Sequence, residues 1–330
     1  MNRRWLFWVG VAVSAVFLYF ALQGLHLDKL VEDLRRTNLA WLLPGIGAYF
    51  VSVGLRAMRW SCLLKSVTAL TPQQLYSVVV IGYMGNNVYP ARIGELLRAY
   101  ILRRNYQTPI PSTLATILIE RAMDSAVMLG FVVAGLPAVA GLDAAVERGL
   151  ALLGAALVVA LAGMIWLAAR AEAAGDLADR ILDCLLPQRL SLPLQGVVHR
   201  FAQGAQSLRR PNDLAFVVAT TVAVWLFETV KYWCVAQAFS LTLPINGLML
   251  VNGLSNLFTI LPGAPGAVGT FDAGGVLGMT ALGVERSLAV AYVLVLHAVL
   301  WFPVTALGLV LMVREGLRWT DLRRAEASAA

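Results

Sequence analysis

Apolar runs of about 20 residues recur along nearly the whole chain, and this feature constrains the fold more than any other. A run of that length is what an α-helix needs to cross a hydrocarbon core about 30 Å thick. The chain of 330 residues is 59% hydrophobic and only 14% charged, which predicts an all-α polytopic membrane protein. The expected helices cover residues 5–23, 40–58, 72–89, 112–140, 149–169, 212–239, 246–261 and 287–313, with a moderately apolar stretch at 266–284.

The net charge of +7 comes from basic residues at the ends of these runs, not from one patch. That distribution favours a membrane surface as partner and argues against nucleic acid. The three cysteines are scattered without metal-ligand or disulfide-framework spacing. Because the chain also has no HxxxH, GxSxG or Walker-type motif, we expect no cofactor, no metal and no catalytic residue.

The same basic residues predict the orientation, because short cytoplasmic loops are enriched in lysine and arginine. Arg3 and Arg4 precede the first run, and Arg314 follows the last. This arrangement predicts a protein of the cell inner (cytoplasmic) membrane with both termini in the cytoplasm. We assign Arg56 and Arg59, at the end of the second run, to the cytoplasmic flank of that helix.

Two of the runs are expected to enter the membrane and return. The run at 72–89 has Lys65 before it and Arg103 after it, so both its ends are expected to be cytoplasmic, with a break near "NNVYP". The run at 246–261 breaks at "LPGAPGAVG" and would return to the outside. If both runs return to the side from which they enter and both termini are cytoplasmic, about six full spans remain, together with two re-entrant helices that enter from opposite faces.

The two breaks resemble each other, since both run helix, asparagine, proline, glycine, acid, helix. Interrupted helices at corresponding positions of two halves are typical of inverted-topology repeats and indicate the binding site of a transporter. Chance similarity between two Pro/Gly breaks is the alternative interpretation. The matched residues are Asn87, Pro90, Gly94 and Glu95 in the first break and Asn256, Pro262, Gly269 and Asp272 in the second.

We therefore expect one transmembrane domain over residues 1–330. The 170–211 interval is polar and basic, and we interpret it as a cytoplasmic connector between two halves. The expected parts are a first helix and interfacial helix at 1–39, a first repeat at 40–140, a linking span and connector at 141–211, an inverted second repeat at 212–315 and a cytoplasmic tail at 316–330.

Charged residues within or beside the apolar runs are the candidates for a binding site. A charge near the bilayer centre costs ~2.5–3.5 kcal/mol on insertion scales, so such side chains face the protein interior and pair. Buried ion pairs that hold helices together are one interpretation. The other is a site in which Arg92 and Arg98 hold a lipid phosphate, because the guanidinium group binds phosphate in bidentate fashion. The set comprises Arg92, Glu95, Arg98, Glu120, Arg121, Asp124, Glu228, Lys231 and Asp272.

Two uncharged candidates accompany this set. His297 lies in an apolar run, either as a core histidine bonded to a neighbouring carbonyl or as a polar residue of a cavity. Asn256 could donate hydrogen bonds to a substrate or only join packed helices.

The pattern N-x-x-P-x-R-x-G-E-x-x-R at Asn87 to Arg98, the following "ERAMD" and the later "LPGAPGAVGTFDAG" resemble one known family. It is the lysylphosphatidylglycerol synthase transmembrane-region family, also called the flippase-like domain or UPF0104 family. The resemblance covers residues of about 40 to 315. The positions of this sequence that match the motif residues of the family are Asn87, Pro90, Arg92, Gly94, Glu95, Arg98, Glu120, Arg121, Asp124, Pro262, Gly263, Gly266 and Gly269.

Two departures bear on the site. Asp272 stands where the family usually has glutamate, and the last helix has His297 but lacks the arginine that many members carry. The resemblance implies a standalone lipid-translocating region without the soluble aminoacyl-transferase domain.

The expected function is that of a flippase that moves a phospholipid or lipid-linked polar head group between leaflets. The alternatives are a membrane-embedded glycosyl or acyl transferase, or an accessory subunit of a lipid-modifying enzyme. The expected partners are an anionic phospholipid or lipid-linked substrate and the membrane, with a lipid-modifying enzyme or a second copy of the chain as further candidates.

Overall fold

The computed structural model describes residues 12–17, 19, 27–89, 93–139, 210–261 and 263–317, and scattered positions between 148 and 208. Within these residues the secondary structure is entirely helical, as the sequence predicts. The long helices are α2 (Leu27–Arg36), α3 (Leu42–Leu64), α4 (Pro72–Val88), α5 (Ile93–Tyr106), α6 (Ile110–Gly135), α10 (Pro211–Ala238), α11 (Ile245–Phe258), α12 (Thr270–Ala281) and α13 (Arg286–Arg314). Short 3₁₀ turns are η1 (Leu39–Trp41), η3 (Leu136–Ala138) and η5 (Pro265–Ala267).

Most helix boundaries follow from local sequence signals. Thr71 caps α4 by accepting a hydrogen bond from the backbone of Gln74, and Pro72 occupies the first turn, where its missing N–H is not needed. Pro211 likewise occupies the first turn of α10, there without a side-chain cap. The expected helix at 149–169 and most of the connector lie outside the described residues.

One expected boundary is wrong, and the error matters for the site. The helix expected to end at residue 58 continues to Leu64. Arg56 and Arg59 are therefore buried residues of α3 and not members of a solvated flank. The physical reason is that carboxylates from other helices surround them, a contact that local sequence does not reveal.

Among the described residues, three segments are long and apolar enough to cross a membrane, namely Leu39–Leu64, Pro211–Ala238 and Arg286–Arg314. At about 1.5 Å per residue, such helices exceed the roughly 30 Å of a hydrocarbon core. Helix α6 has 26 residues and is therefore also long enough, but it carries Glu120, Arg121 and Asp124 in its central part.

Helices α4 and α5 form a tightly packed antiparallel hairpin. Glycines let the two backbones approach, because a Cβ atom added to Gly94 would lie 1.8 Å from the carbonyl oxygen of Gly82. The backbone N–H of Gly94 also donates to Oδ1 of Asn86. The 93–106 helix thus returns along the one that precedes it.

Helices α11 and α12 form a second hairpin of the same kind. A Cβ added to Gly274 would lie 2.7 Å from the carbonyl oxygen of Leu254, and one added to Gly278 would lie 3.0 Å from Cα of Val251. The connection between them contains η5, where Gly266 has a positive φ of 71°.

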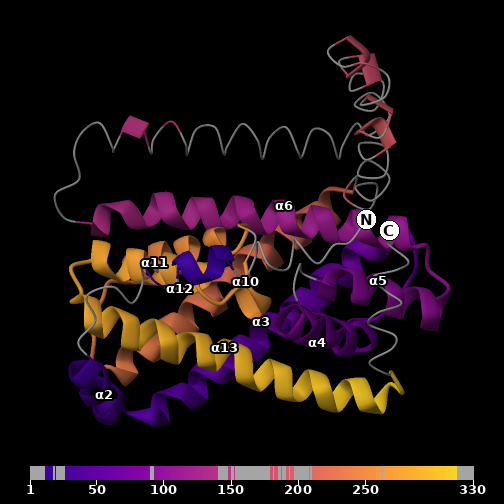
Figure 1. Ribbon diagram of the computed structural model, residues 1–330. Coiled ribbons are helices and arrows are strands. Elements are labelled where there is room, and N and C mark those ends of the chain that lie inside the picture. Colours follow the sequence, from indigo (N-terminus) through magenta and orange to yellow (C-terminus); the bar gives the residue numbers. More distant parts are fainter. Residues whose placement is uncertain are drawn as a thin grey trace.

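The remaining helices pack across the bundle in antiparallel pairs (Figure 1). Helix α3 pairs with α10, α6 pairs with α11, and α13 pairs with α4. Gly253 of α11 approaches the carbonyl oxygen of Met128 in α6, and Gly308 of α13 approaches Met84 of α4. Among the described residues, three buried apolar clusters result, one mainly on α3 to α6, one mainly on α10 to α13, and a small one between α6 and α10.

Candidate functional site

The centre of the candidate site is Arg59 of α3, whose side chain is completely buried. Its guanidinium group donates to Oδ1 of Asp124 at 2.6 Å and to Oε1 of Glu120 at 2.9 Å. It also donates to the hydroxyl of Thr221 at 3.0 Å. Arg59 thereby joins α3, α6 and α10 at one point.

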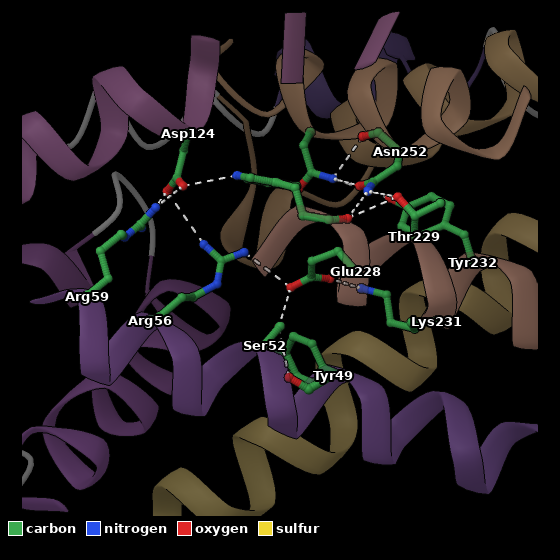
Figure 2. A network of polar contacts seen from close by, with 12 residues as sticks. Tyr49, Ser52, Arg56, Arg59, Asp124, Glu228, Thr229, Lys231, Tyr232 and Asn252 are labelled. Carbon is green, nitrogen blue, oxygen red and sulfur yellow. Dashed lines mark hydrogen bonds and ion pairs between the residues drawn. The ribbon is translucent and has the colours of Figure 1, made fainter. Parts of the chain in front are cut away.

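Arg56, one turn earlier on α3, extends the network toward the other half of the chain (Figure 2). Its Nη2 donates to Oε1 of Glu228 at 3.1 Å, and its Nη1 lies 3.5 Å from Oδ2 of Asp124. Glu228 also accepts from Lys231 at 2.6 Å and from the Ser52 hydroxyl at 2.8 Å. Every side chain in this part of the network is buried.

Arg98 of α5 reaches the network from another side. It donates to Oε2 of Glu120 at 2.9 Å, so Glu120 is shared between two arginines. Its guanidinium carbon lies 3.9 Å from the ring centroid of Trp60, and Trp60 donates its indole N–H to the Thr116 hydroxyl at 3.1 Å. Arg98 is thus fixed by a carboxylate and by an aromatic face.

Arg121 of α6 is the accessible member of the network. It lies 3.3 Å from Asp124 and 3.7 Å from Glu120, and 28% of its side chain is exposed. Glu95, in the first turn of α5, is half-buried and close enough to Arg121 to interact electrostatically. Arg121 therefore offers the part of this charge cluster that a ligand can reach first.

The charges of the network do not balance among the described residues. The acids are Glu120, Asp124 and Glu228, with Glu95 beside Arg121, and the bases are Arg56, Arg59, Arg98, Arg121 and Lys231. Several buried donors have no hydrogen-bond partner in the described part of the chain, although such groups are nearly always paired in proteins. They are the Nε atoms of Arg56, Arg59, Arg98 and Arg121, together with the hydroxyl of Tyr83.

The structure brings together six of the charged residues that the sequence selects, namely Arg98, Glu120, Arg121, Asp124, Glu228 and Lys231. The two arginines of α3 that connect them, Arg56 and Arg59, were not among the candidates. A signal was present, because Ser52, Arg56 and Arg59 recur at helical spacing and so share one face of α3. The predicted residues Pro90, Arg92 and Pro262 lie outside the described residues.

The asparagines of the two breaks take part in helix packing. Asn87 donates to the Thr305 hydroxyl of α13 at 2.9 Å. Asn256 donates to Oδ1 of Asn252 at 2.9 Å and to the Tyr232 hydroxyl at 3.3 Å. The side-chain amide nitrogens of both residues thus donate to acceptors within the protein.

The glycines selected as break residues play different structural parts. Gly266 and Gly269 have positive φ values of 71° and 86°, a conformation that other residues rarely adopt. Gly94 lies inside α5, where the absence of a side chain lets the backbone of α4 approach closely. Gly263 lies beside Thr270 and Ser14.

Asp272 and His297 form a separate pair beside the second break. Nδ1 of His297 lies 2.7 Å from Oδ1 of Asp272, and Nε2 lies 3.0 Å from the carbonyl oxygen of Gly266. Oδ2 of Asp272 accepts from the backbone N–H of Gly269 at 2.8 Å. Within the described ranges, no group of three histidine, cysteine or acidic residues is arranged to hold a metal ion.

Comparison with known proteins gives a family and several relatives. The family model described as "Lysylphosphatidylglycerol synthase TM region" matches residues 7–308. A UPF0104 membrane protein of Methanothermobacter thermautotrophicus is 22% identical, with 91% of each chain covered. The UPF0104 membrane protein MJ1595 of Methanocaldococcus jannaschii is 25% identical, with 91% of this chain and 92% of the relative covered.

A third relative has a name that suggests an enzyme. It is "Glycosyltransferase AglD" of Haloferax volcanii, which is 26% identical over 91% of this chain. The match covers 53% of that protein, so the chain spans about half its length. No solved structure matches the chain.

Proposed function

Because the chain belongs to the lysylphosphatidylglycerol synthase transmembrane-region family, we propose that it moves a lipid with a phosphate-bearing head group between leaflets. The observation that carries the proposal is the excess of positive charge in a network of buried ion pairs. Five basic side chains face four carboxylates, Glu95 included, among the described residues. An anionic head group would supply the missing negative charge.

The depth of the network supports this assignment. Arg56, Asp124 and Glu228 lie in the middle third of α3, α6 and α10, respectively. If these helices cross the membrane, the network lies near the bilayer centre, where each uncompensated charge costs ~2.5–3.5 kcal/mol on insertion scales. A site at that depth is equally distant from both leaflets, as alternating access requires.

The proposed architecture has six spans and two re-entrant hairpins arranged as inverted repeats. The helix contacts support it, because they keep the same pattern when α3–α6 are exchanged with α10–α13. The α3–α10 pair maps onto itself, and the α6–α11 pair maps onto the α13–α4 pair. The two breaks also meet, since a Cβ on Gly266 would lie 3.5 Å from the carbonyl oxygen of Asn87.

Arginine suits the proposed ligand. Its planar group can donate two parallel hydrogen bonds to a phosphate, and it stays charged in apolar surroundings. Arg121 is the partly exposed member of the network, so we assign it the first contact with the phosphate. We propose the inner membrane as the location, with cytoplasmic termini.

The test is leaflet exchange by the purified full chain in liposomes. Fluorescent phosphatidylglycerol, phosphatidylethanolamine and the uncharged lipid glucosylceramide are incorporated, and an impermeant quencher reports the fraction in the outer leaflet. We expect exchange of a phosphate-bearing lipid and not of glucosylceramide. Arg121→Gln should slow that exchange about tenfold or more, because a hydrogen bond to a charged group contributes about 1.5–3 kcal/mol.

The matched control is Lys65→Ala, which removes one positive charge from the exposed end of α3 and should leave exchange unchanged. Equal exchange of all three lipids, or an unaffected Arg121→Gln protein, would refute the proposal.

The same liposomes test the enzymatic alternative, which the name of the archaeal relative AglD supports. A new covalent lipid product formed from an added nucleotide-sugar or acyl donor, without leaflet exchange, would favour a transferase. Exchange without any product favours the proposed flippase. If the purified protein shows neither leaflet exchange nor a new product, an accessory role is favoured.

A further inference from the structure

His297 is held between two hydrogen-bond acceptors that belong to different elements. On one side is the carboxylate of Asp272 in α12, 2.7 Å from Nδ1, and on the other is the carbonyl oxygen of Gly266 in η5, 3.0 Å from Nε2. The histidine itself belongs to α13. The ring therefore connects α13 to the second break itself and to the helix that follows it.

The geometry fixes the number of protons in this group. A carbonyl oxygen only accepts, so Nε2 must carry a hydrogen. The contact at Nδ1 needs a second hydrogen, carried either by Nδ1 or by Asp272. A neutral imidazole and an ionised carboxylate together supply only one. Both contacts thus exist only when the pair holds one additional proton, and the pair is then electrically neutral.

The surroundings of the pair provide no other ionic partner within the described residues. From α12 come Asp272 itself and Phe271, whose ring centroid lies 4.9 Å from that of His297. The 3₁₀ turn η5 contributes a carbonyl group and no titratable side chain. Helix α4 contributes the carbonyl oxygen of Asn87 next to Gly266. On α13 the neighbouring buried residue Leu296 is apolar.

We propose that His297 and Asp272 form a proton-binding site that holds the η5 turn of the second break against α13. We call this contact the latch. When the proton leaves for water, the pair has one hydrogen for two contacts. The ionised carboxylate of Asp272 is a stronger acceptor than the Gly266 carbonyl, so the hydrogen stays on Nδ1 and the hydrogen bond to Gly266 is lost. The pair then carries a net negative charge, which is unfavourable in an apolar interior. Proton loss therefore releases η5 from α13.

The break is built to move when this contact is lost. Gly266, Ala267 and Gly269 all have positive φ, with values of 71°, 58° and 86°, so the turn is held in a backbone conformation that is unfavourable for alanine. Its tip lies against Trp301 and the end of α4, where the two breaks meet. If the proposed lipid transport holds, proton binding and release at His297 would supply its energy coupling, and this part rests on that proposal.

The latch is tested by thiol labelling of the full chain at Thr270, which is completely buried in the first turn of α12. Thr270→Cys is combined with replacement of the buried Cys62 and Cys234, while the exposed Cys184 is kept as an internal reference. The measured quantity is the ratio of labelling at the two thiols between about pH 5 and about pH 8, the range in which histidine normally changes charge. The ratio cancels the dependence of thiol reactivity on pH.

Two variants distinguish the latch from a general effect of pH. In Asp272→Asn, the amide can donate to Nδ1 while Nε2–H donates to Gly266, so the loaded arrangement needs no additional proton. We expect a low ratio at every pH in this variant, and a high ratio at every pH in His297→Phe. In the chain with neither change, the labelling ratio should rise from low to high as the pH rises. The proposal would be overturned if the labelling ratio of that chain did not depend on pH. It would also be overturned if the ratio of the Asp272→Asn protein rose with pH as much as that of the chain with neither change.

Lipid exchange gives a separate measurement of coupling. An imposed pH gradient should accelerate exchange of a phosphate-bearing lipid in the unmodified protein, and should have no effect in Asp272→Asn. If no lipid is exchanged under any condition, the transport proposal fails, whereas the labelling ratios still decide whether the proton site exists. If exchange occurs but ignores the gradient, the coupling role fails.

Discussion

Substitution of Gly94 by alanine is the most direct test of the hairpin formed by α4 and α5. The added Cβ would lie 1.8 Å from the carbonyl oxygen of Gly82 and 2.7 Å from Oδ1 of Asn86, whereas Cβ atoms essentially never come within 3.0 Å of such atoms. The nearest atom belongs to the backbone of α4, so no side-chain rotation can relieve the overlap. The helices must separate, and the hydrogen bond from the Gly94 N–H to Asn86 is strained or lost.

The expected loss of unfolding free energy is about 3 kcal/mol, the upper part of the range for overpacked interiors. The measurement is unfolding by SDS in mixed micelles, followed by circular dichroism. Gly54→Ala is the matched control, because Gly54 lies inside α3 with no atom within 4 Å of an added Cβ. It should stabilise the protein by about 0.5–1 kcal/mol through helix propensity. Equal unfolding midpoints for the two variants would refute the close packing of α4 and α5.

Three further predictions use the same unfolding measurement. Arg59→Met should cost about 3–5 kcal/mol, because two buried carboxylates of α6 lose their shared partner; a loss below about 1 kcal/mol would contradict the network. Trp60→Leu should cost about 2 kcal/mol or more, since Arg98 loses the aromatic face 3.9 Å from its guanidinium carbon, and an unchanged midpoint would show that this contact contributes nothing. Lys65→Ala should cost less than about 1 kcal/mol, because its pair with Asp213 is exposed. The hydrogen bond with Asp213 raises the pKa of Lys65, so this small contribution is present at neutral pH and is lost only as the pH rises through that raised pKa; a larger effect near neutral pH would contradict the assignment.

The helices could be predicted from the sequence because their signals are local. The expected 72–89 helix is observed as Pro72–Val88, where a cap and a proline mark the start. The expected 287–313 helix is observed as Arg286–Arg314. Length of the apolar run, capping residues and turn-forming glycines all act within a few residues of each boundary.

The site could be predicted only in part because its partners come from distant segments. The spacing of Glu120 and Asp124 places both on one face of α6, and the sequence shows this directly. Arg56 and Glu228 are 172 residues apart, and nothing local indicates that they meet. An arginine after an apolar run fits a solvated flank and a buried helix end equally well, and only the carboxylates of α6 and α10 decide between them.

The charges at the centre of α6 also determine how this chain can be assembled. A lone helix that carries Glu120, Arg121 and Asp124 partitions poorly into lipid, at ~2.5–3.5 kcal/mol for each central charge. Helix α3, with the arginines that neutralise the two acids, precedes α6 in synthesis and can receive it. Helix α10 comes later, but its own Glu228 and Lys231 pair within one turn. Biogenesis would therefore proceed by insertion of α3 and α6 as a neutralised pair, after which α10 docks as a separately stable helix.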